Sequence, residues 1–273
     1  MTSFDGLTGG GADASVTDGT IPDGPARLDG GEDGAADASD ALLDAGACKV
    51  TGGPAMIRVN AAFCIDATEV TNAEYAAFLS AVGTSVRPGL PGACAFKTTH
   101  IPNDWPRGSG FDAYPVIEVD WCDAWAFCAW AGKSMCGAIG GGPAPASAAA
   151  DPTVDAWYLA CSGGAHTYPY GDTFDPARCN GPSAGHEGGA PAGTFAQCTG
   201  GVPGLSEMSG NLQEWEDSCG ADAGTGDPCA DRGGAWHHYD TQPGEQVRLR
   251  CDHRDTSPRG SRLDNLGIRC CAY

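Results

Sequence analysis

The sequence is poor in positive charge and has no long apolar run. Lys and Arg number 15 against 35 Asp and Glu, which gives a formal net charge of -20. Such a surface repels phosphate backbones and anionic lipids, so we expect no nucleic-acid partner. No stretch approaches the roughly 18 apolar residues of a transmembrane helix, so we expect no membrane span. The acidic excess suits divalent cations and basic partners.

Several enzyme motifs are absent as well. The chain has no Gly-x-Ser-x-Gly, no His-Glu-x-x-His and no Rossmann fingerprint, which argues against the hydrolases, zinc proteases and dinucleotide enzymes that carry them. Residues 137–147 are rich in glycine but lack the Gly-Lys-Ser/Thr ending of a phosphate loop. The residues after Met1 contain neither a basic nor an apolar segment, so no signal peptide is visible.

Cysteine, by contrast, is abundant. The chain has 14 cysteines, spread from Cys48 to Cys271 without the repeated Cys-x-x-Cys spacing of zinc-binding modules. This usage favours disulfides formed in an oxidising compartment. We therefore expect an extracytoplasmic protein, whether secreted, periplasmic or tethered to a surface. Structural metal thiolates and reduced cytosolic thiols are the alternatives.

The chain divides into two zones of different composition. Residues 1–47 are mainly Gly, Ala, Asp, Ser and Thr, with Arg27 as their one basic residue. Such a segment buries too little apolar area to offset its chain entropy, so it is predicted to be a disordered acidic tail. Residues 48–273 have the composition of a folded domain. With 42 glycines, 19 prolines and no repeats in the chain, we expect a monomeric, loop-rich, irregular α+β domain stabilised by disulfides.

Two helices are predicted from their capping patterns. Thr71 and Glu74 form a capping box, and an apolar face with helical spacing follows at Tyr75, Phe78, Leu79 and Val82. Asp120 and Asp123 form a second box, and Gly132 is the predicted end of that helix. Its apolar face consists of Trp121, Trp125 and Cys128.

A third helix is predicted to begin at Asp151. This residue is a suitable N-cap, and Pro152 would occupy the first helical position. After Gly163 we expect turns and short strands up to the end of the chain.

Seven segments occur in an order that resembles a known family. They are IDATEVTNAEYAAFL, PVIEVDWCDAWAFCAWAGK, WYLACSGG, YPYGD, GLSEMSGNLQEWEDS, RGGAW and NLGIRC. Together they resemble the formylglycine-generating enzyme (FGE)-sulfatase family, also called sulfatase-modifying factors, over roughly residues 55–272. The resemblance implies an irregular α+β fold similar to that of C-type lectins. Catalytic members oxidise a cysteine of a sulfatase to formylglycine with copper and oxygen, whereas other members are sulfoxide synthases or ligand-binding proteins.

The sequence departs from the family pattern at the active site. His238 stands where the resemblance places the first copper-binding cysteine, and no cysteine lies between Cys229 and Cys251. Ala235 replaces the serine of the turn, and Gln213 replaces an aromatic residue of the pocket. Copper(I) requires soft thiolate ligands, so we expect neither formylglycine generation nor a copper or iron cofactor.

Three residues are weaker candidates for catalysis or ligand contact. Arg254 and Asn265 match residues of the family's substrate groove, and His238 lies at the position of the lost cysteine. The groove would then accept a protein, a peptide or a small polar ligand. The alternative for Arg254 is an ordinary surface or ion-paired arginine.

The adjacent pair His237 and His238 is a weak candidate for a transition-metal site. On a strand, neighbouring side chains point to opposite faces, so both histidines could not easily bind one ion. His253 or Tyr239 could instead complete an iron or copper site with His238. The alternative is a solvated or hydrogen-bonded pair at the mouth of a non-catalytic cleft.

A calcium site is expected from the resemblance. Calcium prefers oxygen ligands, including the backbone carbonyls of tight turns. The positions that match the family's ligands are Glu207, Gly210, Leu212 and Glu214. A weaker second site would begin at Asn180 and Gly181. The alternative is a Gly-Asn turn with solvated carboxylates.

Spacing alone does not determine disulfide pairing. The resemblance suggests that Cys128 pairs with Cys270 or its neighbour Cys271, and that Cys161 pairs with Cys251. Three local pairs are further expectations: Cys48 with Cys64, Cys179 with Cys198, and Cys219 with Cys229. Partners for the remaining cysteines stay open: Cys94, Cys122, Cys136 and one of the terminal pair.

The leading hypothesis is an exported, calcium-stabilised binding or interaction domain of this family without formylglycine-generating activity. The alternative is a metal-dependent oxidoreductase of the formylglycine-generating or sulfoxide-synthase type, acting on a protein or small thiol. A third hypothesis is a structural component of the cell envelope with no specific ligand.

Overall fold

The computed structural model describes residue 48 and residues 51–83, 85–186 and 188–273. All of them belong to one compact unit, Leu42–Tyr273. The acidic tail predicted over residues 1–47 lies outside the described residues.

Both helices predicted from capping boxes form. Helix α2 (Asn72–Val82) begins after Thr71, whose side chain accepts the N–H of Glu74 while Glu74 bonds back to the Thr71 N–H. Helix α3 (Trp121–Trp130) begins after Asp120 with the same reciprocal pair to Asp123. Because each cap joins residues three positions apart, these starts are encoded locally.

Replacing Thr71 with alanine is expected to lower the free energy of unfolding by about 1 kcal/mol, because an N–H at the start of α2 loses its acceptor. Urea unfolding of Thr71→Ala measures this cost. Thr153→Ala is the control, since Thr153 is exposed in a turn and bonds only to Asp151. Equal stabilities of the two variants would contradict the capping role of Thr71.

The third helix begins later than the sequence predicted. Helix α4 (Ala156–Ser162) has Asp155, not Asp151, as its N-cap, and the Asp155 carboxylate accepts the N–H of Tyr158. The Asp151 carboxylate instead accepts the N–H and the hydroxyl of Thr153 within a turn. Local bonds of this kind compete with helix formation, so Pro152 does not open a helix.

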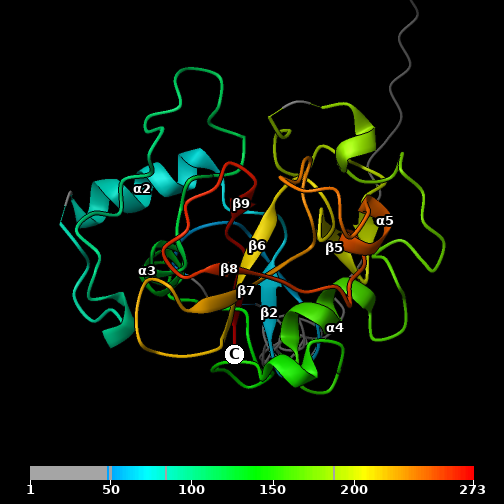
Figure 1. Ribbon diagram of the computed structural model, residues 1–273, viewed down its shortest axis with the longest axis horizontal. Coiled ribbons are helices and arrows are strands. Elements are labelled where there is room, and N and C mark those ends of the chain that lie inside the picture. Colours follow the sequence, from blue (N-terminus) through cyan, green and yellow to red (C-terminus); the bar gives the residue numbers. More distant parts are fainter. Residues whose placement is uncertain (1–47, 49–50, 84, 187) are drawn as a thin grey trace, which may run out of the picture. The chain divides into compact units, whose positions relative to one another are not determined.

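The strands of the described residues form three small sheets. The first is ordered β1-β2-β10-β3, the second is β4-β5, and the third is β8-β7-β6-β9, with β6 and β9 parallel and its other pairs antiparallel. Figure 1 shows β6 and β7 in the centre of the view, with α2 and α4 on opposite sides of them. The strand bounds are β1 (Met56–Arg58), β2 (Cys64–Asp66), β3 (Ser134–Met135), β4 (Thr199–Gly200), β5 (Val202–Ser206), β6 (Gln213–Cys219), β7 (Pro228–Arg232), β8 (Asp255–Pro258), β9 (Leu266–Gly267) and β10 (Cys270–Ala272).

Short helical segments complete the fold. One of them, α5 (Glu245–Arg248), lies in the region where only turns and strands were expected. In the described part of the chain, single turns of 3-10 helix cover Gly92–Cys94, Ala146–Ala148 and Pro182–Ala184. None of the helices in the described part of the chain combines the length and apolar character that a membrane crossing requires.

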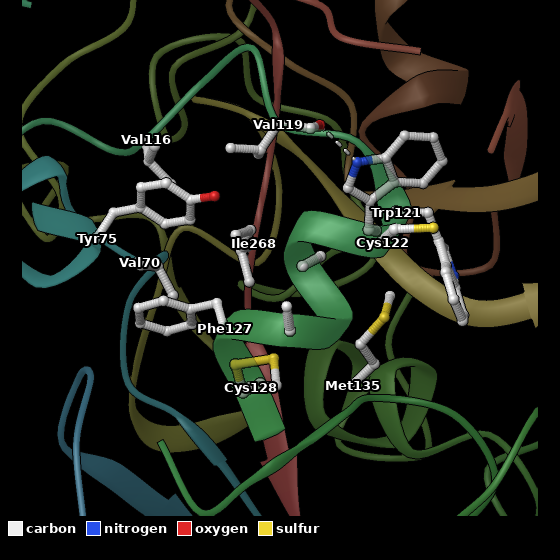
Figure 2. Packing of buried hydrophobic residues seen from close by; sticks show 14 of the residues in the cluster. Val70, Tyr75, Val116, Val119, Trp121, Cys122, Phe127, Cys128, Met135 and Ile268 are labelled. Atoms are coloured by element: carbon white, nitrogen blue, oxygen red, sulfur yellow. Dashed lines mark hydrogen bonds between the residues drawn. A yellow bond between two sulfur atoms is a disulfide. The ribbon is translucent and has the colours of Figure 1, made fainter. Parts of the chain in front are cut away.

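The larger core cluster packs around α3. Tyr75 and Phe78 of α2 are fully buried, and the Tyr75 ring stacks on Phe127 with centroids 5.8 Å apart. Figure 2 shows Tyr75 and Phe127 together with Val70 on one side of α3. The apolar face predicted for α2 is therefore the face that packs, whereas α3 is buried on nearly every side and Trp125 of its predicted face is only partly buried.

Seven disulfides cross-link the domain. All 14 cysteines lie among the described residues, and none is free. Five pairs are those expected: Cys48–Cys64, Cys128–Cys270, Cys161–Cys251, Cys179–Cys198 and Cys219–Cys229. The two pairs left open are Cys94–Cys122 and Cys136–Cys271. The mixed, loop-rich, disulfide-stabilised architecture is the one predicted.

Candidate functional site

One end of the third sheet brings polar residues from four strands together. Gln213 begins β6 and Asp231 lies at the far end of β7, directly opposite Asp255 at the start of β8. Asn265 immediately precedes β9, which pairs with the start of β6. Because β6 and β7 are antiparallel, the first residues of β6 and the last residues of β7 lie at the same end of the sheet.

A pocket of 170 Å³ opens at this end of the sheet, and we call it the His238 pocket. His238 follows β7 and reaches the pocket from an irregular segment, not from the strand assumed in the sequence analysis. The lining residues are Gln213, Asp231, His238, Tyr239, Asp240, Arg248, Asp255, Thr256, Ser257, Leu263 and Asn265. Four positions singled out from the sequence therefore line one cavity: His238, Tyr239, Gln213 and Asn265.

Hydrogen bonds of two side-chain amides connect lining residues of the pocket. Asn265 is 2 % exposed, and its amide donates to the Gln213 carbonyl over 3.4 Å and to the backbone carbonyl of His237 over 3.1 Å. The Gln213 amide donates to one oxygen of Asp231. These bonds leave Asn265 Oδ1 and the second Asp231 oxygen without a hydrogen-bond partner in the protein.

His238 is held neutral. Neither of its ring nitrogens has a hydrogen-bond partner in the protein. Burial, assisted by the positive charge of Arg248, lowers the pKa of His238 to about 4. At neutral pH the ring therefore presents one acceptor nitrogen and one N–H donor.

Arg248 lines the pocket, and most of its donors are already hydrogen-bonded. Its guanidinium donates to the carboxylates of Asp240 and Asp255 and to the backbone carbonyls of Gln242 and Pro243. Arginine has donors only, so these contacts leave little capacity to bind an anion.

The other histidine and arginine candidates lie outside the pocket lining. His237 Nε2 lies 2.9 Å from the Asp264 carboxylate, whereas His238 enters the pocket, so the pair does not converge. Arg254 donates to the backbone carbonyl of Ser218 on strand β6. The groove role expected for Arg254 is therefore not supported by its position. His253, the other suggested metal partner, is also absent from the lining.

The two carboxylates among the predicted calcium ligands are hydrogen-bonded within the protein. The Glu207 carboxylate accepts the backbone N–H groups of Gly193 and Phe195. The Glu214 carboxylate accepts from Trp157 Nε1 over 2.6 Å and from Arg269 Nε over 2.7 Å. The oxygens of both carboxylates therefore already accept hydrogen bonds from other groups of the protein. Among the described residues there is no group of three His, Cys, Asp or Glu that could hold a metal.

The remaining predicted calcium positions lie in the same buried turn. Gly210 adopts a left-handed φ of 74° and packs against the Asn180 backbone, and the Leu212 N–H lies 3.3 Å from a Glu69 oxygen. The Asn180 amide donates to Asn211 Oδ1 over 3.0 Å. The weaker set at Asn180 and Gly181 therefore adjoins the first set instead of forming a separate site.

Several pocket residues escaped the sequence analysis. They belong to no motif and lie on β7 (Asp231), in the segment that follows it (Asp240), on α5 (Arg248) and on β8 (Asp255). For Asp231 a signal was present, since it lies just before the recognised Arg-Gly-Gly turn. Burial, with the nearby Asp255 charge, raises the pKa of Asp231 to about 7.

A model of a known protein family matches most of this chain. The model of the sulfatase-modifying factor enzyme 1-like domain matches residues 20–272. The chain belongs to the FGE-sulfatase family. The prediction made from the seven segments is confirmed.

Curated relatives include catalytic and inactive members of this family. The chain is 33% identical over 169 residues to the inactive C-alpha-formylglycine-generating enzyme 2 of Mus musculus, an alignment that covers 57% of this chain and 48% of that protein. It is 28% identical over 294 residues to the formylglycine-generating enzyme of Thermomonospora curvata, covering 92% and 82%. The chain thus spans only about half of the length of its mouse relative.

Solved structures support the fold. PvdO from Pseudomonas aeruginosa superposes with a TM-score of 0.51 at 21% identity, covering 82% of this chain and 90% of that one. CarF gives a TM-score of 0.50 at 21% identity, covering 77% and 85%. At this identity the likeness concerns the architecture of the family and not its chemistry.

Proposed function

We propose that this chain is an extracytoplasmic, non-catalytic FGE-sulfatase domain that binds a small polar ligand or a peptide. The observation that carries the proposal is the His238 pocket. His238, at the position where the resemblance places a catalytic cysteine, lines this pocket together with Asp231 and Asn265, and all three side chains have buried polar atoms without a hydrogen-bond partner in the protein. Buried polar groups are normally paired, and unpaired ones in a cavity indicate a ligand or water.

Cysteine chemistry supports the loss of formylglycine generation. Every one of the 14 cysteines is in a disulfide, so no thiolate is at hand for copper(I). The name of the mouse relative describes an inactive enzyme, which agrees with a binding role here. The seven disulfides are typical of oxidising compartments, which supports the proposed location.

The test is oxygen consumption with copper and a cysteine-containing peptide. We expect the same rate for the protein and for His238→Ala, because His238 without thiolates does not form the copper(I) site. His166→Ala is the control, since His166 is half exposed and lies outside the pocket. Consumption that disappears only in His238→Ala would contradict the proposal.

That contrary result would favour the alternative, a metal-dependent oxidoreductase acting on a protein or small thiol. One observation favours this alternative: the unpaired, unprotonated imidazole of His238 is in the form that binds metals. The similarity to a formylglycine-generating enzyme over 92% of this chain is compatible with it.

Calcium binding stays a prediction from the family resemblance. An ion at Glu207 and Glu214 would have to displace the donors that now occupy both carboxylates. A bound ion stabilises the folded state in proportion to the logarithm of its concentration over its Kd. Thermal unfolding in calcium and in chelator tests this: a Tm that is higher in calcium would show that the loop rearranges around an ion.

A further inference from the structure

Residues 237–241 lie in the irregular segment between β7 and α5. The N–H group just before them, that of Trp236, bonds to the backbone carbonyl of Asn211 over 2.9 Å. No backbone group of residues 237–241 bonds to a backbone group of another described residue. A segment without such bonds opens at a lower free-energy cost than a strand or a helix.

Arg248 of α5 fixes the far end of this segment. Its guanidinium donates to the backbone carbonyls of Gln242 over 2.6 Å and Pro243 over 3.0 Å. It also donates to Asp255 of β8 over 2.6 Å, which ties α5 to the third sheet. Within the segment itself, the contact of Arg248 is with the exposed carboxylate of Asp240.

The first part of the segment is held by the residues just before β9. The Asp264 carboxylate accepts the Tyr239 hydroxyl over 2.7 Å and lies 2.9 Å from His237 Nε2. The Asn265 amide donates to the His237 carbonyl over 3.1 Å. The Asp264 side chain is 42% exposed, and contacts of exposed carboxylates contribute little individually. The segment is therefore held by a few weak side-chain contacts.

The same segment forms part of the wall of the His238 pocket. It contributes His238, Tyr239 and Asp240, whereas the other lining residues belong to β6, β7, β8, α5 and the residues before β9. Tyr239 is 67% exposed. Both ring nitrogens of the preceding His238 are buried and have no hydrogen-bond partner among the described residues. A ligand can therefore bond to this imidazole only after the segment has moved.

We propose that residues 237–241 form a flap that opens to uncover the His238 imidazole and to admit the ligand of the pocket. This inference rests on the proposed function and adds the route by which its ligand enters. Opening breaks the contacts of the flap with Asp264, Asn265 and Arg248. The ladder hydrogen bonds that join β7 to β6 and β8 stay intact. Loops that close over a site in this way commonly control access to it.

The experiment measures how fast diethylpyrocarbonate modifies individual histidines of the full chain. The reagent attacks accessible nitrogens of neutral imidazoles, and fragment mass spectra locate the modified residue. Because burial lowers the pKa of His238 to about 4, this ring is in the reactive neutral form at neutral pH. Its rate of modification then depends on how often the flap is open.

Two other histidines calibrate the rate of His238. The His166 side chain is 50% exposed and gives the rate of an accessible ring. His100 is fully buried and hydrogen-bonded, so it reacts only when the domain unfolds. We expect His238 to react more slowly than His166 and faster than His100. A His238 rate equal to that of His100 would overturn the inference, because opening would then be absent or global.

Variants identify the contacts that close the flap. Asp264→Ala should speed the modification of His238 about 10-fold, because the closed flap loses the partner of both Tyr239 and His237. Tyr239→Phe loses the hydroxyl and keeps the ring, so a smaller increase of about 3-fold is expected. The rates of His166 and His100 should not change.

Asp222→Ala is the matched control. Asp222 is also an exposed carboxylate, pairs with Arg259 and lies outside the His238 pocket. The His238 rate in this variant should equal that of the unaltered protein. If Asp264→Ala and Tyr239→Phe behaved like Asp222→Ala, the flap would be ruled out.

The failure of the flap and the failure of the proposed function are distinguishable. The labelling requires neither a ligand nor copper, so a negative result removes the flap and leaves the proposed binding function in place. Oxygen consumption that disappears in His238→Ala would instead contradict the proposed function.

Discussion

Arg269→Met is expected to lower the free energy of unfolding by about 3–5 kcal/mol at pH 7, because it leaves buried carboxylates without their cation. Arg269 is 1 % exposed. Its guanidinium donates to Glu214 over 2.7 Å and to the backbone carbonyls of Asp66 and Ser206 over 2.8 and 2.9 Å. The positive charge also lies near Glu69, whose carboxyl has a pKa raised well above its ordinary value by burial and by Glu207.

The loss should depend on pH. Burial raises the pKa of Glu214, and the Arg269 charge opposes that rise. Without Arg269 the pKa of Glu214 rises further, so the folded state binds its proton more tightly than the unfolded chain does. The difference between Arg269→Met and the unaltered protein should therefore be small near pH 4.5, the ordinary pKa of Glu, and should grow toward pH 7.

Denaturant unfolding between pH 4.5 and 7 measures both effects. Arg250→Met is the matched control, because Arg250 is 41% exposed and pairs with Asp252 near the surface. A pair of this kind contributes at most about 1 kcal/mol. If Arg269→Met cost no more than Arg250→Met, or cost the same at every pH, the buried charge cluster would not have the role assigned to it.

Removing the Cys128–Cys270 disulfide should have the second large effect. The bridge joins α3 to β10 across a sequence separation of 142 residues. In the chain-entropy model, a loop of this length contributes about 5 kcal/mol by restricting the unfolded chain. The double variant Cys128→Ala, Cys270→Ala should lose most of this free energy.

The pair Cys219–Cys229 provides the control within the same chain. Its sequence separation is 10 residues, for which the same model gives about 3 kcal/mol. Urea unfolding of the two double alanine variants compares the losses directly. A greater loss from the short loop than from the long one would show that packing, and not loop entropy, governs these bridges.

Part of the functional site could be predicted from the sequence. Gln213 and Asn265 were identified because they lie within recognised segments, and His238 because it lies two residues beyond one. Asp231 and Arg248 were not, because their role depends on strands and a short helix that meet only in the fold. The calcium prediction rested on the sequence positions of Glu207 and Glu214. The donors that bond to their carboxylates come from other segments of the chain, so the sequence positions alone did not reveal these hydrogen bonds.

The sequence by itself determined the features that depend on neighbours a few residues apart. The starts of α2 and α3 are set by Thr71 with Glu74 and by Asp120 with Asp123, pairs that recur within one helical turn. The order of seven family segments determined the family in the same way, since each is a local pattern.

Only the tertiary structure decided the features that depend on residues far apart. It selected Asp155 over Asp151 as the cap of α4, where Asp155 is fully buried and the following N–H bonds to Gly137. It also paired Cys94 with Cys122 and Cys136 with Cys271, which spacing leaves open. The chemistry of the His238 pocket follows the same rule. Whether an acceptor in the pocket is unpaired depends on which neighbouring donors bond to it. Those donors come from segments that meet only in the folded domain.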